Sequence, residues 1–542
     1  MDKAIFNILH DGLKRAENAR YTFVEPNRQR TSFKPFFSSL SLIDSISYEL
    51  EISNGGIMHA GKNPSRNFHG RVEIRMGDYE KGGGTGSDTF SISQGLDLPS
   101  SSKEIWESLN SAFWSCVEDY GQRNLNAMGS RNKREKYVYF SREPKSGYIA
   151  ETRDLAFDFP KVSDTLIEAS RRLSEKMSLP FWTNIDFEAE KIDDYLVNSE
   201  GSVVFGSFLR YRTSLEVIAL DSKNRYIPHN KLFYSLRTSE IPTLNELMEQ
   251  GEQLKQELFD IIKAPTQKNG TYPVIMCPKN HGVLWHEVIG HALEGHRMQE
   301  DEEDSDDEER VTLFLGKLGK KIGPKFISVT DDPTAIGKDG YYAYDSEGVK
   351  SQKVLLIENG ILRNYLHSRA SAGFFKKHSN GHARASSSND PVARMSNLFV
   401  RSANEVSLEE LKEELIKECR KQDEPYGLLF KDTQGGLTLP DECHFETYPS
   451  QVFRVHRNGN MERVRGIYVL GTPYQVMKNL IKTGKDYEEF RGYCGAESGW
   501  VPDTTTAPSA LFNSIEINRI PDSSYGEIKK IVIPLPGVNT KK

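Results

Sequence analysis

The most constraining feature of this sequence is a short apolar segment, Gly282 to His296, into which histidine and glutamate are set. Within it, Glu287 directly follows His286, and His291 comes five positions after His286. Because the surrounding residues are apolar and helix-forming, this concentration of histidine with glutamate indicates a metallohydrolase site more readily than a packed core. The spacing is H-E-x-x-x-H, which is one residue longer than the common H-E-x-x-H motif.

The additional residue has a geometric consequence. In a regular α-helix, residues four apart are separated by about 40° around the axis, whereas residues five apart are separated by about 140°. Two imidazole rings so far apart do not converge easily on one ion. A π-helical turn would bring them together, and Gly290 lowers the cost of such an irregularity. The spacing therefore predicts that His286 and His291 bind one metal ion from a distorted helix.

A third metal ligand is expected from elsewhere in the chain, since a catalytic zinc ion typically has three protein ligands and one open position. Cys494 is the first candidate because it precedes a glycine in a predicted loop, where a thiolate can approach a metal ion. Glu294 and His296 are the alternatives. Glu294 would serve equally well to orient a histidine ligand. The other interpretation of His296 is a surface residue at the helix end.

Glu287 is suited to the role of general base. Beside a metal ligand, it would take a proton from water as the water attacks a carbonyl group, and then return it to the leaving amine. The alternative interpretation of Glu287 is a carboxylate on the helix surface without a catalytic role. The sequence contains neither a G-x-S-x-G nucleophile motif nor a P-loop, and Gly82 to Gly86 suits a hairpin tip better than a phosphate site.

Length and composition exclude several classes of protein. A chain of 542 residues with 37% hydrophobic and 27% charged residues is expected to be globular, with two or three domains. The net charge of −7 gives no reason to expect nucleic acid as a partner. We find no apolar stretch of about 18 residues for a membrane span and no signal peptide. The five scattered cysteines favour the reducing cytoplasm.

The order of the predicted elements indicates an α+β fold of two domains, an N-terminal domain of mixed helices and strands and a β-rich C-terminal domain. We place the domains at residues 1–230 and 231–542, divided at the polar segment 223–231. Helices are predicted for residues 1–20, 106–131, 162–177, 243–262 and 408–424, with capping boxes at Thr243 and Ser407. Strands are predicted for residues 41–52, 69–76, 137–140, 182–188, 201–219, 272–277, 326–330, 352–357, 361–365, 426–430, 451–456, 463–470 and 509–517.

Two segments are predicted to be irregular. Residues 80–88 are rich in glycine and are expected to form a flexible loop. The acidic segment 299–310 is expected to be a solvated surface insertion, because its charges repel one another. It lacks the spaced ligands and central glycine of an EF-hand calcium site.

The segment His286 to Gly295 resembles the signature of the TldD/PmbA metallopeptidases, of the TldD type. Further segments are similar to successive blocks of that family, and the resemblance covers residues 260–520 well and the first domain only loosely. These segments are Thr330 to Thr334, Asp345 to Gly348, Val354 to Leu362, Tyr365 to His367, Arg394 to Asn397, Cys494 to Gly495, and Val501 to Pro502.

The resemblance implies a zinc-dependent peptidase in which His286, His291 and Cys494 bind Zn²⁺ and Glu287 activates the zinc-bound water. It also implies a dimer that encloses the active site, either a homodimer or a heterodimer with a relative that lacks the His–Glu motif. Unfolded or short peptides would bind in extended form, and neither nucleic acid nor a membrane would be a partner. The alternative is a non-hydrolytic peptide-binding or regulatory partner subunit. The complete set of four residues favours the enzyme.

Overall fold

The computed structural model describes residues 3–24, 30–61, 64–79, 83–92, 98–129, 140–175, 181–298, 313–386, 389–439, 444–521 and 524. The predicted acidic insertion at 299–310 lies wholly in the gap at 299–312, outside these residues. The α-helices are α1 (Lys3–Asn18), α2 (Leu98–Gly129), α3 (Phe159–Ser174), α4 (Leu244–Lys263), α5 (Pro278–Trp285), α7 (Arg369–Phe374), α8 (Leu408–Lys421) and α9 (Pro473–Asn479). No helix in the described ranges is long and apolar enough to cross a membrane.

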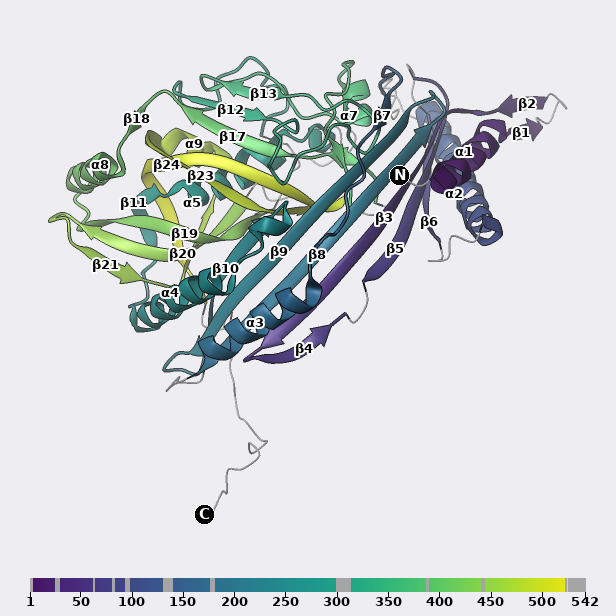
Figure 1. Ribbon diagram of the computed structural model, residues 1–542. Coiled ribbons are helices and arrows are strands. Elements are labelled where there is room, and N and C mark those ends of the chain that lie inside the picture. The colour runs from purple at the N-terminus through teal and green to yellow at the C-terminus, as the bar shows by residue number, and fades with distance from the viewer. Residues whose placement is uncertain are drawn as a thin grey trace.

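The first sheet consists of long antiparallel strands in the order β10-β9-β8-β3-β5-β6, with β4 paired to β3 and the short β7 parallel to β9. In Figure 1, α1 and α2 lie at one end of these strands, and α3 and α4 lie at the other. The strands are β3 (Pro35–Ser53), β4 (Gly56–Ala60), β5 (Ser65–Met76), β6 (Thr85–Ile92), β7 (Gly147–Ile149), β8 (Phe181–Asn198), β9 (Val203–Leu220) and β10 (Tyr226–Ser235), beside a separate hairpin, β1 (Tyr21–Val24) and β2 (Arg30–Phe33).

Side-chain alternation determines which face of the first sheet the helices cover. Along β3, Leu40, Leu42, Leu50 and Ile52 are buried at alternate positions of one face. The first two pack with α1 and α2, and the last two pack with α3 and α4. Because successive residues of a strand point to opposite faces, the other face of the sheet remains free to line the space toward the rest of the chain.

The second sheet contains most of the remaining strands, in the order β11-β19-β20-β22-β24-β17-β12-β13-β14, and includes β18, β21 and β23. Its main hydrophobic core surrounds α5 and the segment that follows it. The strands are β11 (Gly270–Met276), β12 (Ile327–Asp331), β13 (Val354–Glu358), β14 (Ile361–Leu362), β17 (Asn397–Ser402), β18 (Glu405–Val406), β19 (Tyr426–Leu439), β20 (His444–His456), β21 (Met461–Val464), β22 (Ile467–Gly471), β23 (Leu480–Ala496) and β24 (Gly499–Arg519), beside the separate pair β15 (Ala383–Arg384) and β16 (Val392–Ala393).

The α+β class and the predicted helices are confirmed. Both capping boxes form, at Thr243 and at Ser407. A tight turn between the predicted strands 352–357 and 361–365 joins β13 to β14, and Asn359 and Gly360 adopt the positive φ angles of a hairpin there. These features were predictable because each depends on residues that are close together in the sequence.

Several local predictions were wrong. Cys494 lies in a strand, β23, and not in a loop. The sequence did not reveal β23 because charged residues interrupt its apolar pattern. Part of the predicted loop at 80–88 is strand, since β6 starts at Thr85, while residues 80–82 lie outside the described ranges. Gly466, with a positive φ, separates β21 from β22 within the predicted strand 463–470. Of the predicted strand 137–140, only Phe140 is described, and it is not in a strand.

The packing of α4 bears on the position of the domain division. Strand β10 continues through residues 230 and 231, and α4 packs its buried face, including Leu247, Leu254 and Leu258, into the core beneath the first sheet. We therefore propose that the first domain extends through α4, with the division between Lys263 and Gly270, where β11 begins the second sheet.

Candidate metal centre

The His–Glu segment forms an irregular helix, as its spacing predicts. Helix α5 ends at Trp285, a π-helical turn spans His286–Gly290, and a 3₁₀ turn spans His291–Leu293. The backbone N–H of His291 donates a hydrogen bond to the carbonyl oxygen of His286, which is the five-residue bond of a π-turn. As a result, the two imidazole rings face the same side of the helix, with their centroids 5.0 Å apart.

Gly290 is required for close packing. It adopts an ordinary helical φ of −56°. A Cβ atom at this position would lie only 1.7 Å from the sulfur of Met395. The π-turn therefore packs so closely against Met395 that only glycine fits at position 290. This constraint was not visible in the sequence, where Gly290 suggested only a tolerance for irregular backbone.

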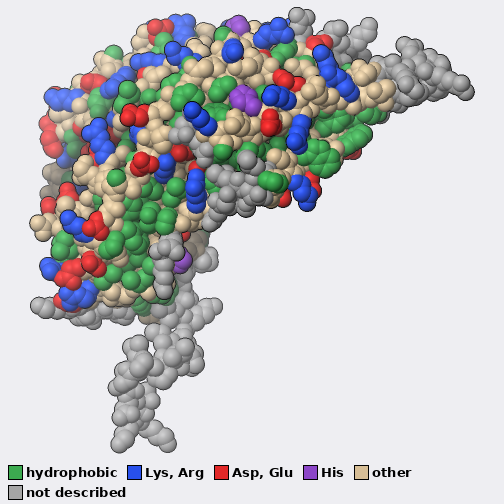
Figure 2. Space-filling view, turned by 45° about the vertical axis from the view of Figure 1, so that its right-hand side comes forward, with side chains coloured by type: hydrophobic (Ala, Val, Ile, Leu, Met, Phe, Trp, Pro, Cys, Tyr) green, Lys and Arg blue, Asp and Glu red, His purple; other side chains and the backbone are tan. Residues whose placement is uncertain are grey.

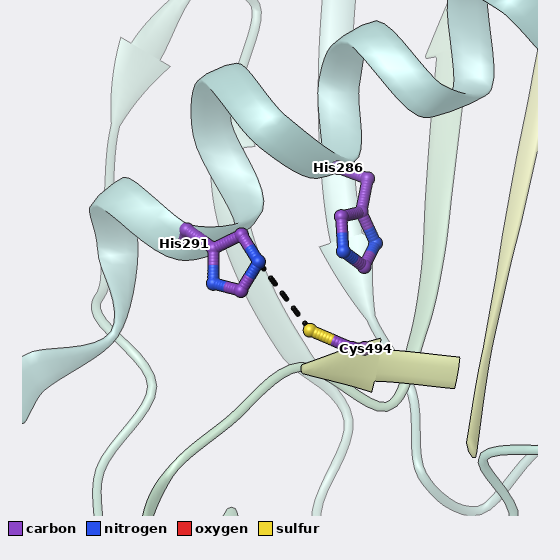
Figure 3. Close-up of side chains that lie close together, drawn as sticks. All are labelled: His286, His291 and Cys494. Atoms are coloured by element: carbon purple, nitrogen blue, oxygen red, sulfur yellow. Dashed lines mark hydrogen bonds between the residues drawn. The ribbon is translucent and has the colours of Figure 1, made fainter. Parts of the chain in front are cut away.

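Cys494 joins the two histidines from the far end of β23. Its Sγ lies 3.4 Å from Nε2 of His291, and the ligand atoms of His286, His291 and Cys494 all lie within 4.8 Å of one another. All three residues are buried. Figure 3 shows both rings, from the irregular helix, and the sulfur, from the strand, converging on one point. Cys494 pairs with Val501 of β24, and this register fixes the position of the sulfur along the strand, opposite the helix.

A buried ionic network surrounds this cluster. Glu294, whose side chain is fully buried, accepts a hydrogen bond from Nδ1 of His291 at 3.2 Å and another from Nε of Arg297 at 3.1 Å. Arg394 lies 3.4 Å from the other carboxylate oxygen of Glu294 and donates to Sγ of Cys494 at 3.0 Å. Glu294 thus holds the His291 ring with Nε2 toward the sulfur, which is the arrangement of a residue that orients a metal ligand.

The other sequence alternative, His296, is directed elsewhere. It is buried, so it is not the surface residue considered above, and it forms an ion pair with Glu497. Sequence reasoning also missed Asp503, whose Oδ2 lies 2.9 Å from Nδ1 of His286. This contact is within ion-pair distance but lacks hydrogen-bond geometry, so Nδ1 of His286 has no hydrogen-bond partner in the described structure. The only signal for Asp503 was its place directly after the Val501 to Pro502 block.

The electrostatics of the cluster suit a divalent cation. Burial opposes ionisation of Cys494, but the positive charges of His291 and His286 lower the pKa of its thiol to about 6. Burial opposes the charged form of His291 as well, yet Cys494 and Glu294 raise its pKa to about 10. These pKa shifts favour a Cys494 thiolate beside protonated imidazoles. A bound metal ion would supply the positive charge that the imidazole protons supply here. The donor set, two imidazoles and one thiolate, fits zinc.

Glu287 lies within the π-turn and faces a cavity, although its side chain is largely buried. The hydroxyl of Thr438 donates to its Oε2 at 2.5 Å. A Cβ atom on Gly436 would lie 2.9 Å from Cγ of Glu287, so strand β19 packs closely against the carboxylate side chain. The position of Glu287 is therefore fixed by neighbours, unlike that of a carboxylate on an exposed helix surface.

The cavity lies between the two sheets and has a volume of about 1170 Å³. His286 and Glu287 line it on one side. The free face of the first sheet, including Glu190 and Asp194 of β8 and Arg210 of β9, lines it on the other side. Of the cluster, His286 reaches the wall of this chamber, which is large enough for a segment of extended peptide.

Comparisons with known proteins identify relatives that are named metalloproteases. Residues 269–519 match the family model of the PmbA/TldA metallopeptidase C-terminal domain. Over 306 residues, the chain is 30% identical to a metalloprotease of Methanocaldococcus jannaschii, covering 56% of this chain and 62% of that protein. Residues 269–519 therefore belong to the TldD/PmbA family. Another TldD/PmbA relative, named a zinc metalloprotease TldD homolog, comes from Saccharolobus solfataricus and is 30% identical over 269 residues, 49% of this chain and 55% of that protein.

Solved structures show that nearly the whole chain shares its fold with proteins of known structure. TldE from Thermococcus kodakarensis aligns with a TM-score of 0.62 at 16% identity, covering 95% of this chain and 99% of that one. A protein of Bacteroides thetaiotaomicron, described as a candidate modulator of DNA gyrase, aligns with a TM-score of 0.64 at 15% identity, covering 96% and 100%. At these identities the likeness concerns the fold alone.

We expect Glu294→Gln to weaken zinc binding about 10- to 100-fold, as is typical when a partner that orients a metal ligand is lost. The substitution removes the charge that fixes Nδ1 of His291 while preserving the shape of the side chain. Zinc affinity is to be measured by competition with a chromophoric chelator. Glu497→Gln is the matched control, because Glu497 lies in the same ionic network but pairs with His296 and Arg297. Unchanged zinc affinity in Glu294→Gln would contradict the orienting role.

Proposed function

We propose that this chain is a zinc-dependent peptidase that hydrolyses peptide bonds in unfolded or short extended peptides. The observation that carries the proposal is the convergence of His286, His291 and Cys494 within 4.8 Å beside Glu287 at the wall of the cavity. Two imidazoles and a thiolate satisfy the three-ligand requirement of a catalytic zinc site. The names of the relatives, metalloprotease and zinc metalloprotease, support the same conclusion.

The roles of the residues follow from their contacts. When bound by His286, His291 and Cys494, zinc would supply a Lewis acid for the substrate carbonyl group. Glu287 accepts the proton of the attacking water and transfers it to the leaving amine. The hydrogen bond from Thr438 holds Oε2 of Glu287, which leaves its second carboxylate oxygen for the proton transfer.

The shape of the chamber favours extended substrates. Strand β10 is the edge strand of the first sheet, and its residues 230–235 line the cavity. The edge of a sheet offers backbone donors and acceptors that bind an extended peptide with little regard to its sequence, although the Tyr234 carbonyl already accepts a hydrogen bond from Arg491. A folded domain is far too large for a chamber of about 1170 Å³.

The second function to consider is a non-hydrolytic peptide-binding or regulatory subunit. The cavity alone would serve both functions, but such a subunit has no need of a buried thiolate, two converging imidazoles and a fixed carboxylate. We also propose that the chain acts in the cytoplasm as a homodimer, or as a heterodimer with a relative that lacks the His–Glu motif. The likeness of its fold to a protein named TldE supports a partner of this kind.

We expect the purified protein to contain about one zinc ion per chain and to cleave an unstructured reporter peptide. Removing the metal with a chelator should abolish cleavage, and adding zinc back should restore it. Metal content is measured by mass spectrometry and cleavage by chromatography of the products. The thermal unfolding of the metal-free protein controls for loss of structure. Peptide binding without cleavage in the zinc-loaded protein would favour the non-hydrolytic function instead.

A further inference from the structure

The wall of the cavity formed by the first sheet carries a row of cross-strand pairs between β8 and β9. Glu188 stands opposite Arg212, and Glu190 stands opposite Arg210. The charged atoms of these pairs lie 3.6 and 4.0 Å apart, respectively. In each of these two pairs an acidic residue of β8 faces a basic residue of β9, which is a stabilising arrangement across antiparallel strands.

The row ends at a carboxylate with no such neighbour. Asp194 points to the same face of β8 as Glu190, but its position on β9 is occupied by Gly206, and its position on β3 is occupied by Ile43. Across the described ranges, no side chain forms a hydrogen bond or an ion pair with the Asp194 carboxylate. Burial raises the pKa of Asp194 to about 6, and no neighbouring cation opposes this effect. At neutral pH the group is therefore mostly ionised and uncompensated.

Aromatic rings lie around this carboxylate. The ring of Phe208 folds back over Gly206, where an added Cβ would lie 2.9 Å from the Phe208 ring and 4.0 Å from Cβ of Asp194. Tyr344 lines the same place, and its ring is supported by Tyr148, with the ring centroids 5.0 Å apart. The faces of aromatic rings attract cations, and a carboxylate among such rings is a suitable environment for an ammonium or guanidinium group.

The position of Asp194 makes it accessible from the chamber. Asp194, Phe208 and Tyr344 line both the main cavity and a smaller one of about 250 Å³ that lies next to it. Asp345 lines both cavities as well, but its carboxylate accepts hydrogen bonds from backbone N–H groups of its own loop and of Ala383. Asp194 is therefore the carboxylate at this junction that is free to bind a ligand.

We propose that the junction of the two cavities is a cation-binding subsite for the peptide substrate, in which Asp194 pairs with an ammonium or guanidinium group and Phe208 and Tyr344 contact it. The cation is either the amino terminus of the peptide or the side chain of a lysine or arginine. The inference rests on the proposed function in that the ligand is a peptide. Glu287 lines the same main cavity, so a peptide anchored at Asp194 occupies the chamber that the proposed base faces.

The test is the binding of short, unstructured, fluorescently labelled peptides to the zinc-loaded full chain carrying Glu287→Gln, so that the peptide stays intact. One peptide has a free amino terminus and a lysine. Three others have an acetylated terminus, norleucine in place of lysine, or both changes. We expect the fully neutral peptide to bind about 10- to 100-fold more weakly than the cationic one, as for a charge-assisted hydrogen bond. Adding Asp194→Asn should remove most of this difference.

The peptides with a single change identify the source of the cation, since the weaker binder of the two lacks the group that Asp194 recognises. Asp186→Asn is the matched control, because Asp186 lies on the same face of β8 but does not line the cavity. It should leave the preference for the cationic peptide intact. Equal binding of neutral and cationic peptides overturns the proposal, and so does a preference that survives Asp194→Asn or is lost equally in Asp186→Asn.

Failure of this proposal is distinguishable from failure of the proposed function. Cleavage is measured separately in the chain with Glu287 intact. A cation preference in binding, without any cleavage, would support the subsite and contradict the peptidase. Cleavage without any cation preference in binding would support the peptidase and overturn the subsite.

Discussion

Glu287→Gln is expected to lower kcat for peptide cleavage by about a hundredfold to ten-thousandfold, the usual contribution of general acid–base catalysis. Glutamine keeps the size of the side chain and one oxygen for the hydrogen bond from Thr438, but it cannot accept the proton of the attacking water at neutral pH. Since Glu287 is not among the three converging ligands, zinc content should stay at the wild-type value. Cleavage and zinc content are to be measured on the same preparation.

Glu446→Gln provides the matched control for this substitution. Glu446 lies on β20, close to the strand that packs against Glu287, but it pairs with Tyr448 and does not line the cavity. Its replacement should leave cleavage near the wild-type rate. Undiminished cleavage in Glu287→Gln would exclude Glu287 from the proposed mechanism, whereas loss of zinc would show that its carboxylate helps to hold the metal.

Cys494→Ser is expected to weaken zinc binding by more than about a hundredfold, with a corresponding loss of cleavage. Losing only an outer partner of a metal site costs about 10- to 100-fold in affinity, and removing a direct ligand costs more. The serine hydroxyl cannot replace the sulfur, because it does not ionise where the thiol, with its pKa lowered to about 6, does. Competition with a chelator gives the affinity.

Cys277→Ser is the control because Cys277 is also buried but lies away from the cluster. Burial raises the pKa of its thiol to about 12, the opposite of the effect at Cys494. It stands at the start of α5, where serine is well suited to cap the helix, so fold and zinc binding should persist. Wild-type zinc affinity in Cys494→Ser would exclude Cys494 as a zinc ligand.

The features that the sequence predicted correctly depend on residues that are near one another along the chain. The H-E-x-x-x-H spacing required a wider turn to bring two rings together, and the π-turn at His286–Gly290 supplies it. The capping boxes and the tight hairpin at Asn359 and Gly360 follow in the same way from a few adjacent residues. Local backbone geometry is sufficient to determine all of these features.

Residue chemistry also made Cys494 a candidate ligand, but only the tertiary structure brings it to His291, 203 residues away in the sequence. No local periodicity encodes that contact, and the charged residues of β23 conceal the strand that makes it. The partners of the site, Arg394, Asp503 and Thr438, likewise come from distant segments.

The sequence by itself therefore determined the irregular helix and the types of side chain available for chemistry. Only the tertiary structure decided which of these side chains meet, and that the unpaired Asp194 faces the same chamber as Glu287. The physical reason is that strand register and the packing of one sheet against another are set by contacts between distant parts of the chain, which are optimised together when it folds.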